Sequence, residues 1–280
     1  GRVVAPKFLG GAEPELGGRD RRAVLADWLT APENPFFARS VVNRVWAHFL
    51  GVGIVEPADD LRVSNPASNA ELLDVLAARF VDSGFDLRDL ARAICLSRAY
   101  QRSSEPNATN ERDLRNFARA HLRRLRAETL LDVIAAVTEI PEKLGGLPLG
   151  ARAVEIADGR TTSYFLDTFG RSPRETVCAC EVSSAPSLSQ VLHLLNGATV
   201  ATRVRASPLA LRCAQEELPL GVALETLSWR LYSRPSTPEE QERWLASFTE
   251  GTSRASFTED LLWALLNSRI DANIQASGYR

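Results

Sequence analysis

The sequence predicts a mainly α-helical protein, an irregular helical bundle in two halves with at most a short strand pair. Three observations support this fold class. Apolar residues recur at spacings of three and four along much of the chain, capping motifs open several of these segments, and glycine or proline closes them. The 280 residues show no internal repeat at a fixed period, so a regular solenoid is not expected.

Glycine and proline also indicate how the chain is divided. Residues 1–18 contain two Gly-Gly pairs and are predicted to form a tether. A second break is expected at Pro141, Gly145, Gly146, Pro148 and Gly150. It separates an N-terminal helical half, 19–145, from a C-terminal helical half, 146–280, that packs on it as a second domain or as part of one domain.

The first half is expected to consist of helices joined by one polar loop. Ser68-Asn69-Ala70-Glu71 has the spacing of a capping box, and Asp86 is the expected cap of the next helix. Helices are predicted over residues 21–30, 35–50, 68–84, 86–100 and 111–138. The shared core is predicted to contain Trp28, Trp46, Phe49, Leu72, Leu76 and Phe80.

The second half is predicted to be helical except for a short strand over 151–157. Helical segments are expected over residues 164–169, 187–205 and 220–232, and from Thr237 and Ser256 onward. The segment 187–205 carries apolar residues at Leu188, Val191, Leu192, Leu195 and Val200.

Composition excludes several classes of function. Basic and acidic residues, 33 and 35, give a net charge of −2, which argues against a nucleic-acid-binding module. Hydrophobic residues make up 45%, and no apolar run approaches the roughly 18 residues of a membrane span. No phosphate-binding glycine loop or dinucleotide fingerprint is present, and without Cys-x-x-Cys-His the chain is expected to bind no haem of its own.

The strongest candidate site is Cys178-Ala179-Cys180-Glu181. In extended backbone, residues two apart point to the same side, so both sulfurs could bind one metal ion. Zinc would need about two more ligands, for which Glu181 and His193 are the nearest candidates. A redox pair and simple packing of two small thiols are the alternatives. The same segment is preceded by the charged residues Arg171, Arg174 and Glu175.

A polar ladder is expected on the predicted helix 111–138. His121, Arg124, Glu128 and Asp132 are spaced by three, four and four residues, which places them on one helical face. The ladder is interpreted either as an ion-pair network that holds the helix or as a carboxylate pair for acid–base work or cation binding.

A second polar stripe is expected on the predicted helix 35–50. It consists of Arg39, Asn43, Arg44 and His48, and Asp59 and Asp60 in the following loop are the expected partners. A structural network is the favoured interpretation, and an anion site is the alternative.

Four long stretches resemble one known family. They read "ADWLTAPENPFFARSVVNRVWAHFLGVGIVEPADDLRVSNPASNAELLDVLA", "LSRAYQRSS", "RRLRAETLLDVI" and "FGRSPRETVCACEVSSAPSLSQVLHLLNG". They resemble domain-of-unknown-function family 1553, a planctomycete-type domain found C-terminal to cytochrome c-like domains in large exported proteins. The resemblance implies a mostly helical module, exported or periplasmic, whose partners are the upstream domains of the same polypeptide. It implies no established reaction.

Two functions remain in competition. The first is an accessory binding or scaffold domain in an exported, cytochrome-linked protein. The second is an enzyme domain, redox or hydrolytic, that acts on an extracellular carbohydrate-like substrate through the segment from Cys178 to Glu181 and Arg174. An enzyme requires these side chains to converge on an open pocket.

Overall fold

The computed structural model describes residues 4–175, 185–215 and 218–267. These residues form helices, turns and loops with no strand among them, so the mainly α prediction is confirmed. The chain divides into two compact units, residues 1–121 and 122–280. The predicted boundary after residue 145 therefore lies inside the second unit. Among all the residues that the structure describes, no helix is long and apolar enough to cross a bilayer.

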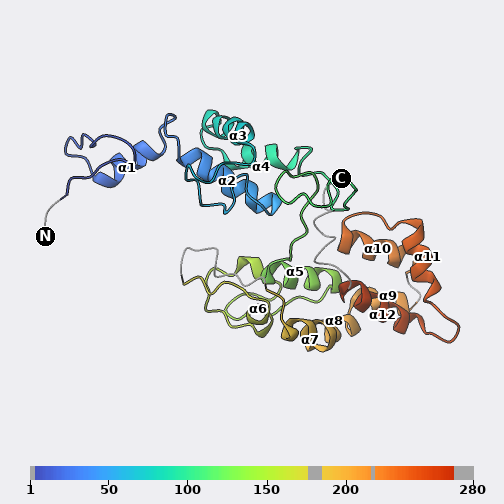
Figure 1. Ribbon diagram of the computed structural model, residues 1–280. Coiled ribbons are helices and arrows are strands. Elements are labelled where there is room, and N and C mark those ends of the chain that lie inside the picture. The colour runs from blue at the N-terminus through green and yellow to red at the C-terminus, as the bar shows by residue number, and fades with distance from the viewer. Residues whose placement is uncertain (1–3, 176–184, 216–217, 268–280) are drawn as a thin grey trace. The chain divides into compact units, whose positions relative to one another are not determined.

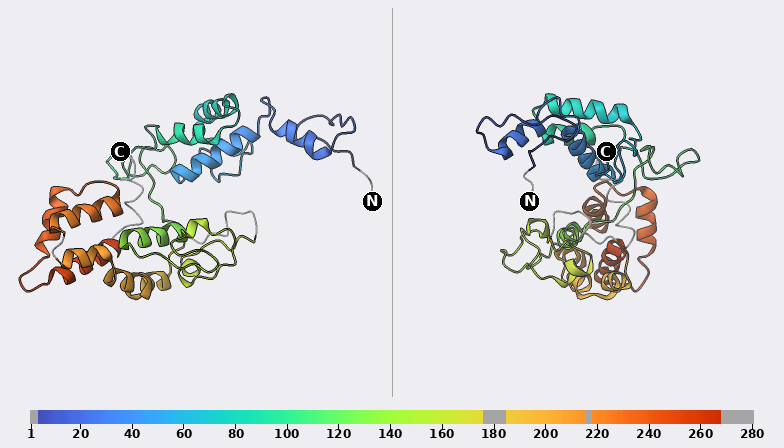
Figure 2. Two further views of the ribbon diagram at one scale, coloured as in Figure 1. Left: turned by 180° about the vertical axis from the view of Figure 1, so that it is seen from behind. Right: turned by 60° about the vertical axis from the view of Figure 1, so that its left-hand side comes forward.

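The described residues of the first unit form the helices α1 (Arg21–Leu29), α2 (Phe37–Leu50), α3 (Ala70–Asp82) and α4 (Leu87–Cys95). The helix α2 packs on both α3 and α4, and it lies beside α3 in each view (Figures 1 and 2). Asp86 caps α4 as predicted, but the side chain that caps α3 belongs to Asn69, which accepts from the N–H of Leu72. Ser68 instead donates to the carbonyl oxygen of Ile54.

The core of the first unit contains most of the predicted residues. Trp46, Leu76 and Phe80 are buried there, with Phe49 and Leu72 half-buried against them. Trp28 is the exception, because its ring stacks on Phe8 at 4.9 Å between centroids and lies outside this cluster. The sequence pattern identified Trp28 as apolar but could not show that it packs on the segment predicted as a tether.

The predicted helix over 111–138 is wrong in its first half. Only Ala127–Thr138 (α5) is helical, and residues 111–126 form turns and extended chain. Asp113 explains part of the difference, since its carboxylate accepts hydrogen bonds from the N–H groups of Asn116 and Ala118. Such side-chain bonds to nearby main-chain groups compete with helix formation.

The second unit is built around α5 (Figure 1). Its other elements are the 3₁₀ turn η1 (Ala153–Glu155), α6 (Tyr164–Thr168), α7 (Leu188–Asn196), α8 (Ala198–Arg205), α9 (Pro208–Ala214), α10 (Leu220–Tyr232), α11 (Pro238–Ala246) and α12 (Arg254–Asn267). The helix α5 packs on η1, α6, α8 and α10, which is why it belongs to this unit although it precedes the glycine-rich break.

Two boundaries in the second unit differ from the prediction. The segment 187–205 is two helices because the chain turns at Gly197, whose N–H donates to the carbonyl oxygen of His193 at 2.8 Å. A Cβ at Gly197 would lie 2.2 Å from that same oxygen, so the turn requires glycine. The predicted strand over 151–157 is instead the turn η1. The last helix begins at Arg254, before the predicted start at Ser256.

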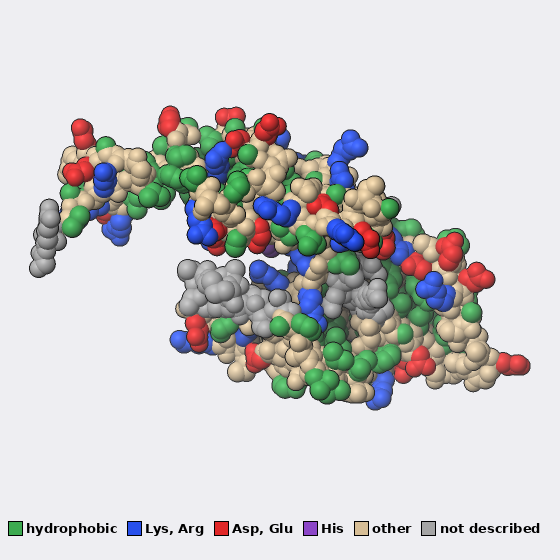
Figure 3. Space-filling model, viewed as in Figure 1, with side chains coloured by type: hydrophobic (Ala, Val, Ile, Leu, Met, Phe, Trp, Pro, Cys, Tyr) green, Lys and Arg blue, Asp and Glu red, His purple; other side chains and the backbone are tan. Residues whose placement is uncertain are grey.

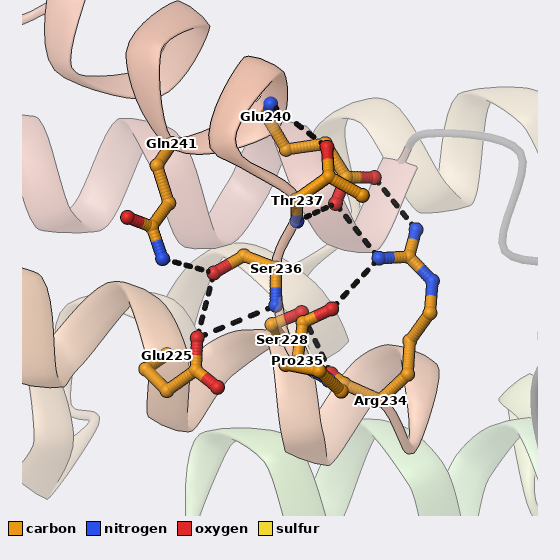
Figure 4. A network of polar contacts seen from close by, with 8 residues as sticks. All are labelled: Glu225, Ser228, Arg234, Pro235, Ser236, Thr237, Glu240 and Gln241. Carbon is orange, nitrogen blue, oxygen red and sulfur yellow. Dashed lines mark hydrogen bonds and ion pairs between the residues drawn. The ribbon is translucent and has the colours of Figure 1, made fainter.

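A polar network fixes the corner between α10 and α11 (Figure 4). Arg234 donates from Nη1 and Nη2 to the two carboxylate oxygens of Glu240, at 2.8 and 2.6 Å. Thr237 caps α11 in the predicted capping box with Glu240. Glu225 accepts from the hydroxyl of Ser236 at 2.7 Å, which ties α10 to the same corner.

Candidate functional site

Arg171 and Arg174 hold a neighbouring loop through its main chain. Nη2 of Arg171 donates to the carbonyl oxygens of Gly159 and Thr161, at 3.0 and 2.6 Å. Nη1 of Arg174 donates to the carbonyl oxygens at positions 156 and 157, at 2.8 and 3.0 Å. We call this pair the arginine clamp. Its guanidinium groups are engaged in holding residues 156–161, which is a structural role.

The loop 156–161 lies very close to Pro173, between the two arginines of the clamp. A Cβ at Gly159 would lie 1.7 Å from the carbonyl oxygen of Pro173, a distance that no side chain can accept. Asp158 shapes the turn, since its carboxylate accepts from the N–H groups of Arg160 and Thr161, and these bonds lower the pKa of that carboxyl. Glycine at position 159 is therefore required by contact with the residues that lead into the predicted site.

The predicted cysteine site itself cannot be placed. Cys178, Cys180 and Glu181 lie outside the described residues, so metal binding and redox pairing at this segment stay predictions. Glu175, the last described residue before them, is exposed. Within the described part of the chain, no group of three or more His, Cys, Asp or Glu side chains is arranged to hold a metal ion.

The ring of His193 packs against three aromatic side chains. Its ring contacts those of Tyr164, Phe165 and Phe169, with centroids 5.4, 5.4 and 6.0 Å away. Nε2 is 3.0 Å from the hydroxyl of Thr199. Burial lowers the pKa of the imidazole. These contacts tie α7 to α6 and α8.

The predicted polar ladder does not form one helical face. His121 and Arg124 precede α5 and lie in the two different units, while Glu128 and Asp132 lie on α5. The pKa of His121 is lowered by burial first and by Arg119 second. Nη1 of Arg124 donates to Oε1 of Gln190 at 2.9 Å. The predicted alignment is wrong because the helix that would have placed these residues on one face begins only at residue 127.

The two carboxylates of the ladder have separate roles on α5. Asp132 accepts from the N–H groups of Ala153 and Val154, at 2.6 and 3.3 Å, and so holds the first residues of the turn η1. Glu128 lies in the first turn of α5, where a negative charge is favourable next to the helix N-terminus. For Asp132, this supports the structural interpretation of the pattern.

Asn43 is the central residue of the other predicted network. It is fully buried, and its amide donates to the carbonyl oxygens of Val55 and Ala58 at 2.9 and 2.8 Å. Its Oδ1 accepts from the N–H of Val55 at 2.9 Å. These three bonds hold the loop after α2 against that helix, as the prediction of a structural network requires.

The charged members of this network pair on the surface. Arg44 donates to Asp59 at 2.6 Å, as expected, but Arg39 pairs with Asp74 of α3, and Asp60 pairs with Arg62. Exposed pairs of this kind stabilise a protein by about 0–1 kcal/mol each. The alternative of an anion site is therefore not supported at these arginines, whose carboxylate partners are nearby.

An ion-pair cluster and a groove next to it left no recognisable signal in the sequence. After α5, Glu139 and Glu142 are held by arginines from α8, α9 and α10. The groove has a volume of about 340 Å³, and its charged lining residues are Asp132, Glu139, Glu142 and Arg152. No sequence signal could pair these groups, since Glu139 and Arg230 are 91 positions apart.

The orientation of α7 was also missed. Leu188, Val191, Leu192 and Leu195 are 73%, 47%, 49% and 40% exposed. Hydrophobic side chains gather along the lower edge of the second unit, where α7 lies (Figure 3). The buried residue of this helix is the polar Gln190. We call these four side chains the α7 face. Their spacing resembles that of a core stripe, which is why the sequence could not show that they point outward.

Comparison with known proteins identifies a family and no reaction. No curated protein and no solved structure matches the chain. The family model PSD1, described as "Protein of unknown function (DUF1553)", matches residues 21–248. This range includes the helices of the first unit, the arginine clamp, the α7 face and the α10–α11 corner. The chain therefore belongs to the DUF1553 family.

Proposed function

We propose that the chain is an accessory binding domain of a larger exported protein that also carries cytochrome c-like domains. Its partner is another domain of the same polypeptide, and it docks through the α7 face. The resemblance to the family supports the exported, multidomain context. The observation that supports docking is the outward orientation of four apolar side chains on one short helix.

The exposure of the α7 face results from specific bonds. Gln190 is 4% exposed and its Nε2 donates to the carbonyl oxygen of Thr168 at 3.1 Å. Its Oε1 accepts from Arg124, at 2.9 Å. Turning the helix to bury its leucines would break these bonds and leave buried polar groups without partners, which costs about 1–3 kcal/mol for each group. The bonds of Gln190 thus hold the apolar side outward.

An outward apolar stripe is a common recognition surface. Apolar area that leaves water contributes about 25 cal/mol per Å², so a partner that covers the four side chains makes the free energy of binding more favourable. Clustered exposed apolar residues are typical of interaction sites, whereas single ones are ordinary. The charged residues once considered for chemistry, Arg171, Arg174 and Asp132, bond to the main chain, which further favours a binding role over catalysis.

The test is a binding measurement with matched variants. The double variant Leu188→Ser and Leu192→Ser removes half of the α7 face without touching the core. Its affinity for the separately produced remainder of the polypeptide, measured by isothermal titration calorimetry, is expected to fall at least about tenfold. Val222→Ser on α10, at a side chain that is 49% exposed, is the control and should bind normally. Equal affinity of the double variant and the control would refute docking through α7.

A further inference from the structure

A short irregular segment leads into the second unit. The boundary between the two compact units lies between His121 and Leu122, and α5 begins at Ala127. We call residues 122–126 the connector. Leu125 packs against the core of the second unit, whereas Arg124 and Arg126 are exposed. The connector is therefore the first stretch of the second unit that a change at the boundary reaches.

Arg124 of the connector bonds to α7. Its Nη1 donates to Oε1 of Gln190 at 2.9 Å, although the two residues are 66 positions apart. Gln190 is 4% exposed, so the acceptor end of this bond lies inside the second unit. Hydrogen bonds from a charged donor are stronger than those between neutral groups. The connector thus holds the first turn of α7 by a directional bond.

The amide of Gln190 joins the connector to two other places in the fold. Oε1 also accepts from the N–H of Ser187 at 3.3 Å, in the capping box that opens α7. Nε2 donates to the carbonyl oxygen of Thr168, the last residue of α6, at 3.1 Å. An amide has one accepting and one donating end, so a donor at Oε1 determines which end points to the connector. Arg124 therefore helps to keep Nε2 directed at α6.

Gln190 and the α7 face lie on roughly opposite sides of the same helix. A helix turns by about 100° per residue, so Gln190 is about 200° from Leu188, the first residue of the face. A rotation of α7 that withdraws Gln190 from the interior must carry the apolar side chains toward it. The orientation of the face therefore depends on the bonds of one polar side chain, and one of these bonds comes from the connector.

We propose that Arg124 is the positioning residue of the α7 face and that, through it, the connector controls docking there. The inference rests on the proposed function of that face. A path of the connector that draws the guanidinium away from Gln190 loosens the first turn of α7, so the partner meets a less ordered surface. Docking in turn stabilises the bonded arrangement, because coupling between two sites acts equally in both directions. The net contribution of one hydrogen bond corresponds to about a two- to tenfold change in affinity.

The first test needs no partner. Hydrogen exchange at the amides of residues 190–194 measures how often α7 opens. Arg124→Ala should accelerate this exchange about two- to tenfold, and Arg124→Lys, which keeps a charged donor, should restore much of the protection. Arg126→Ala is the matched control, because it removes an exposed arginine of the same connector whose side chain makes no capping bond to α5. Equal exchange in Arg124→Ala and Arg126→Ala would overturn the proposal.

A double-mutant cycle shows whether Arg124 acts through Gln190. Gln190→Met keeps the length of the side chain and removes both polar ends of the amide. In that background, Arg124→Ala should accelerate exchange no further, because the bond that it removes is already absent. An equal acceleration in both backgrounds would show that Arg124 stabilises the unit in another way and does not position α7.

The second test measures docking by isothermal titration calorimetry with the separately produced remainder of the polypeptide. Arg124→Ala should bind about two- to tenfold more weakly than Arg126→Ala, and Arg124→Lys should bind nearly as tightly as wild type. Faster exchange in Arg124→Ala with unchanged affinity would overturn control of docking by the connector. If the double variant Leu188→Ser and Leu192→Ser binds as tightly as Val222→Ser, docking through α7 fails. The exchange experiment then still decides whether Arg124 positions α7, so the two failures are distinguishable.

Discussion

The ring of Phe117 packs edge-on against the indole of Trp46, with centroids 5.1 Å apart and planes at 79°. The two residues are 6% and 2% exposed. Phe117 has a positive φ of 56°, a conformation that is uncommon for a residue with a side chain. A loop after α4 therefore completes the core of the first unit, at a place where the sequence predicted part of a long helix.

Phe117→Ala should strongly destabilise the first unit. Removing a buried aromatic ring costs about 3–5 kcal/mol, because the apolar contact is lost and a cavity remains next to Trp46. Urea unfolding monitored by tryptophan fluorescence measures the change. Leu114→Ala in the same loop is the control, because that side chain is 66% exposed, and it should change stability by less than about 0.5 kcal/mol. A similar small change for Phe117→Ala would contradict its role in the core.

Asp113 should make this loop sensitive to acid. Hydrogen bonds from the N–H groups of Ala118 and Asn116 lower the pKa of its carboxyl from 3.8 to about 2. Because the folded pKa is the lower one, the stabilisation is complete above pH 3.8 and is lost as the pH falls toward 2. Asp113→Asn should therefore be less stable than wild type at neutral pH, and the difference should shrink as the pH approaches 2.

Urea midpoints at several pH values, together with NMR titration of the carboxyl, measure this effect. Glu111→Gln is a control in the same loop, at an exposed side chain, and it should follow the wild-type curve. If the difference between Asp113→Asn and wild type were constant from neutral pH to pH 2, the carboxylate would not be the stabilising group.

Glu240→Gln should loosen the corner between α10 and α11. The hydrogen bonds from Arg234 are the main cause of the lowered pKa of Glu240. Glutamine cannot accept both guanidinium bonds, and since the pair is partly exposed we expect a loss of about 1 kcal/mol. The difference should vanish in acid, as the wild-type carboxyl is protonated. Glu242→Gln, an exposed residue of α11, is the control for urea unfolding. An equal loss in both variants would argue against a specific bond.

Gly159→Ala should displace the loop held by the arginine clamp. The added Cβ would lie 1.7 Å from the carbonyl oxygen of Pro173, so the two segments must separate. Overpacking of this kind costs about 1–3 kcal/mol. Gly145→Ala is a matched control, because a Cβ there meets nothing within 4 Å. Hydrogen exchange at residues 156–161 should accelerate in the first variant and not in the second. Unchanged exchange in Gly159→Ala would mean that the close contact is absent.

Local signals in the sequence identified most helices and several of their ends. The apolar spacing around Trp46 and Phe80 predicted two packed helices, and Asp86 and Thr237 cap their helices as expected. These features depend on a few neighbouring residues, so the sequence is sufficient to predict them. Local signals failed at residues 111–126, where Asp113 binds main-chain groups and prevents the helix that the apolar spacing favoured.

The candidate site depended on contacts that no local pattern contains. The spacing that would align His121 with Asp132 was correct only for a helix that does not form there. The clamp of Arg171 and Arg174 was recognised as a charge cluster, but its carbonyl partners lie 10 to 18 residues earlier in the chain. Sequence alone could show that these residues are polar and grouped, and it could not show what they bond to.

By itself, the sequence determined the mainly helical class, the family and the positions of most helices, because periodicity and caps act over a few residues. Only the tertiary structure decided which face of α7 is buried, because Gln190 accepts a bond from Arg124 and donates one to Thr168, and both bonds hold its polar side inward. Tertiary structure also brought Arg203, Arg212 and Arg230 to Glu139 and Glu142. Hydrogen bonds and charge pairs act through space, and their partners here lie as many as 91 residues apart in the chain.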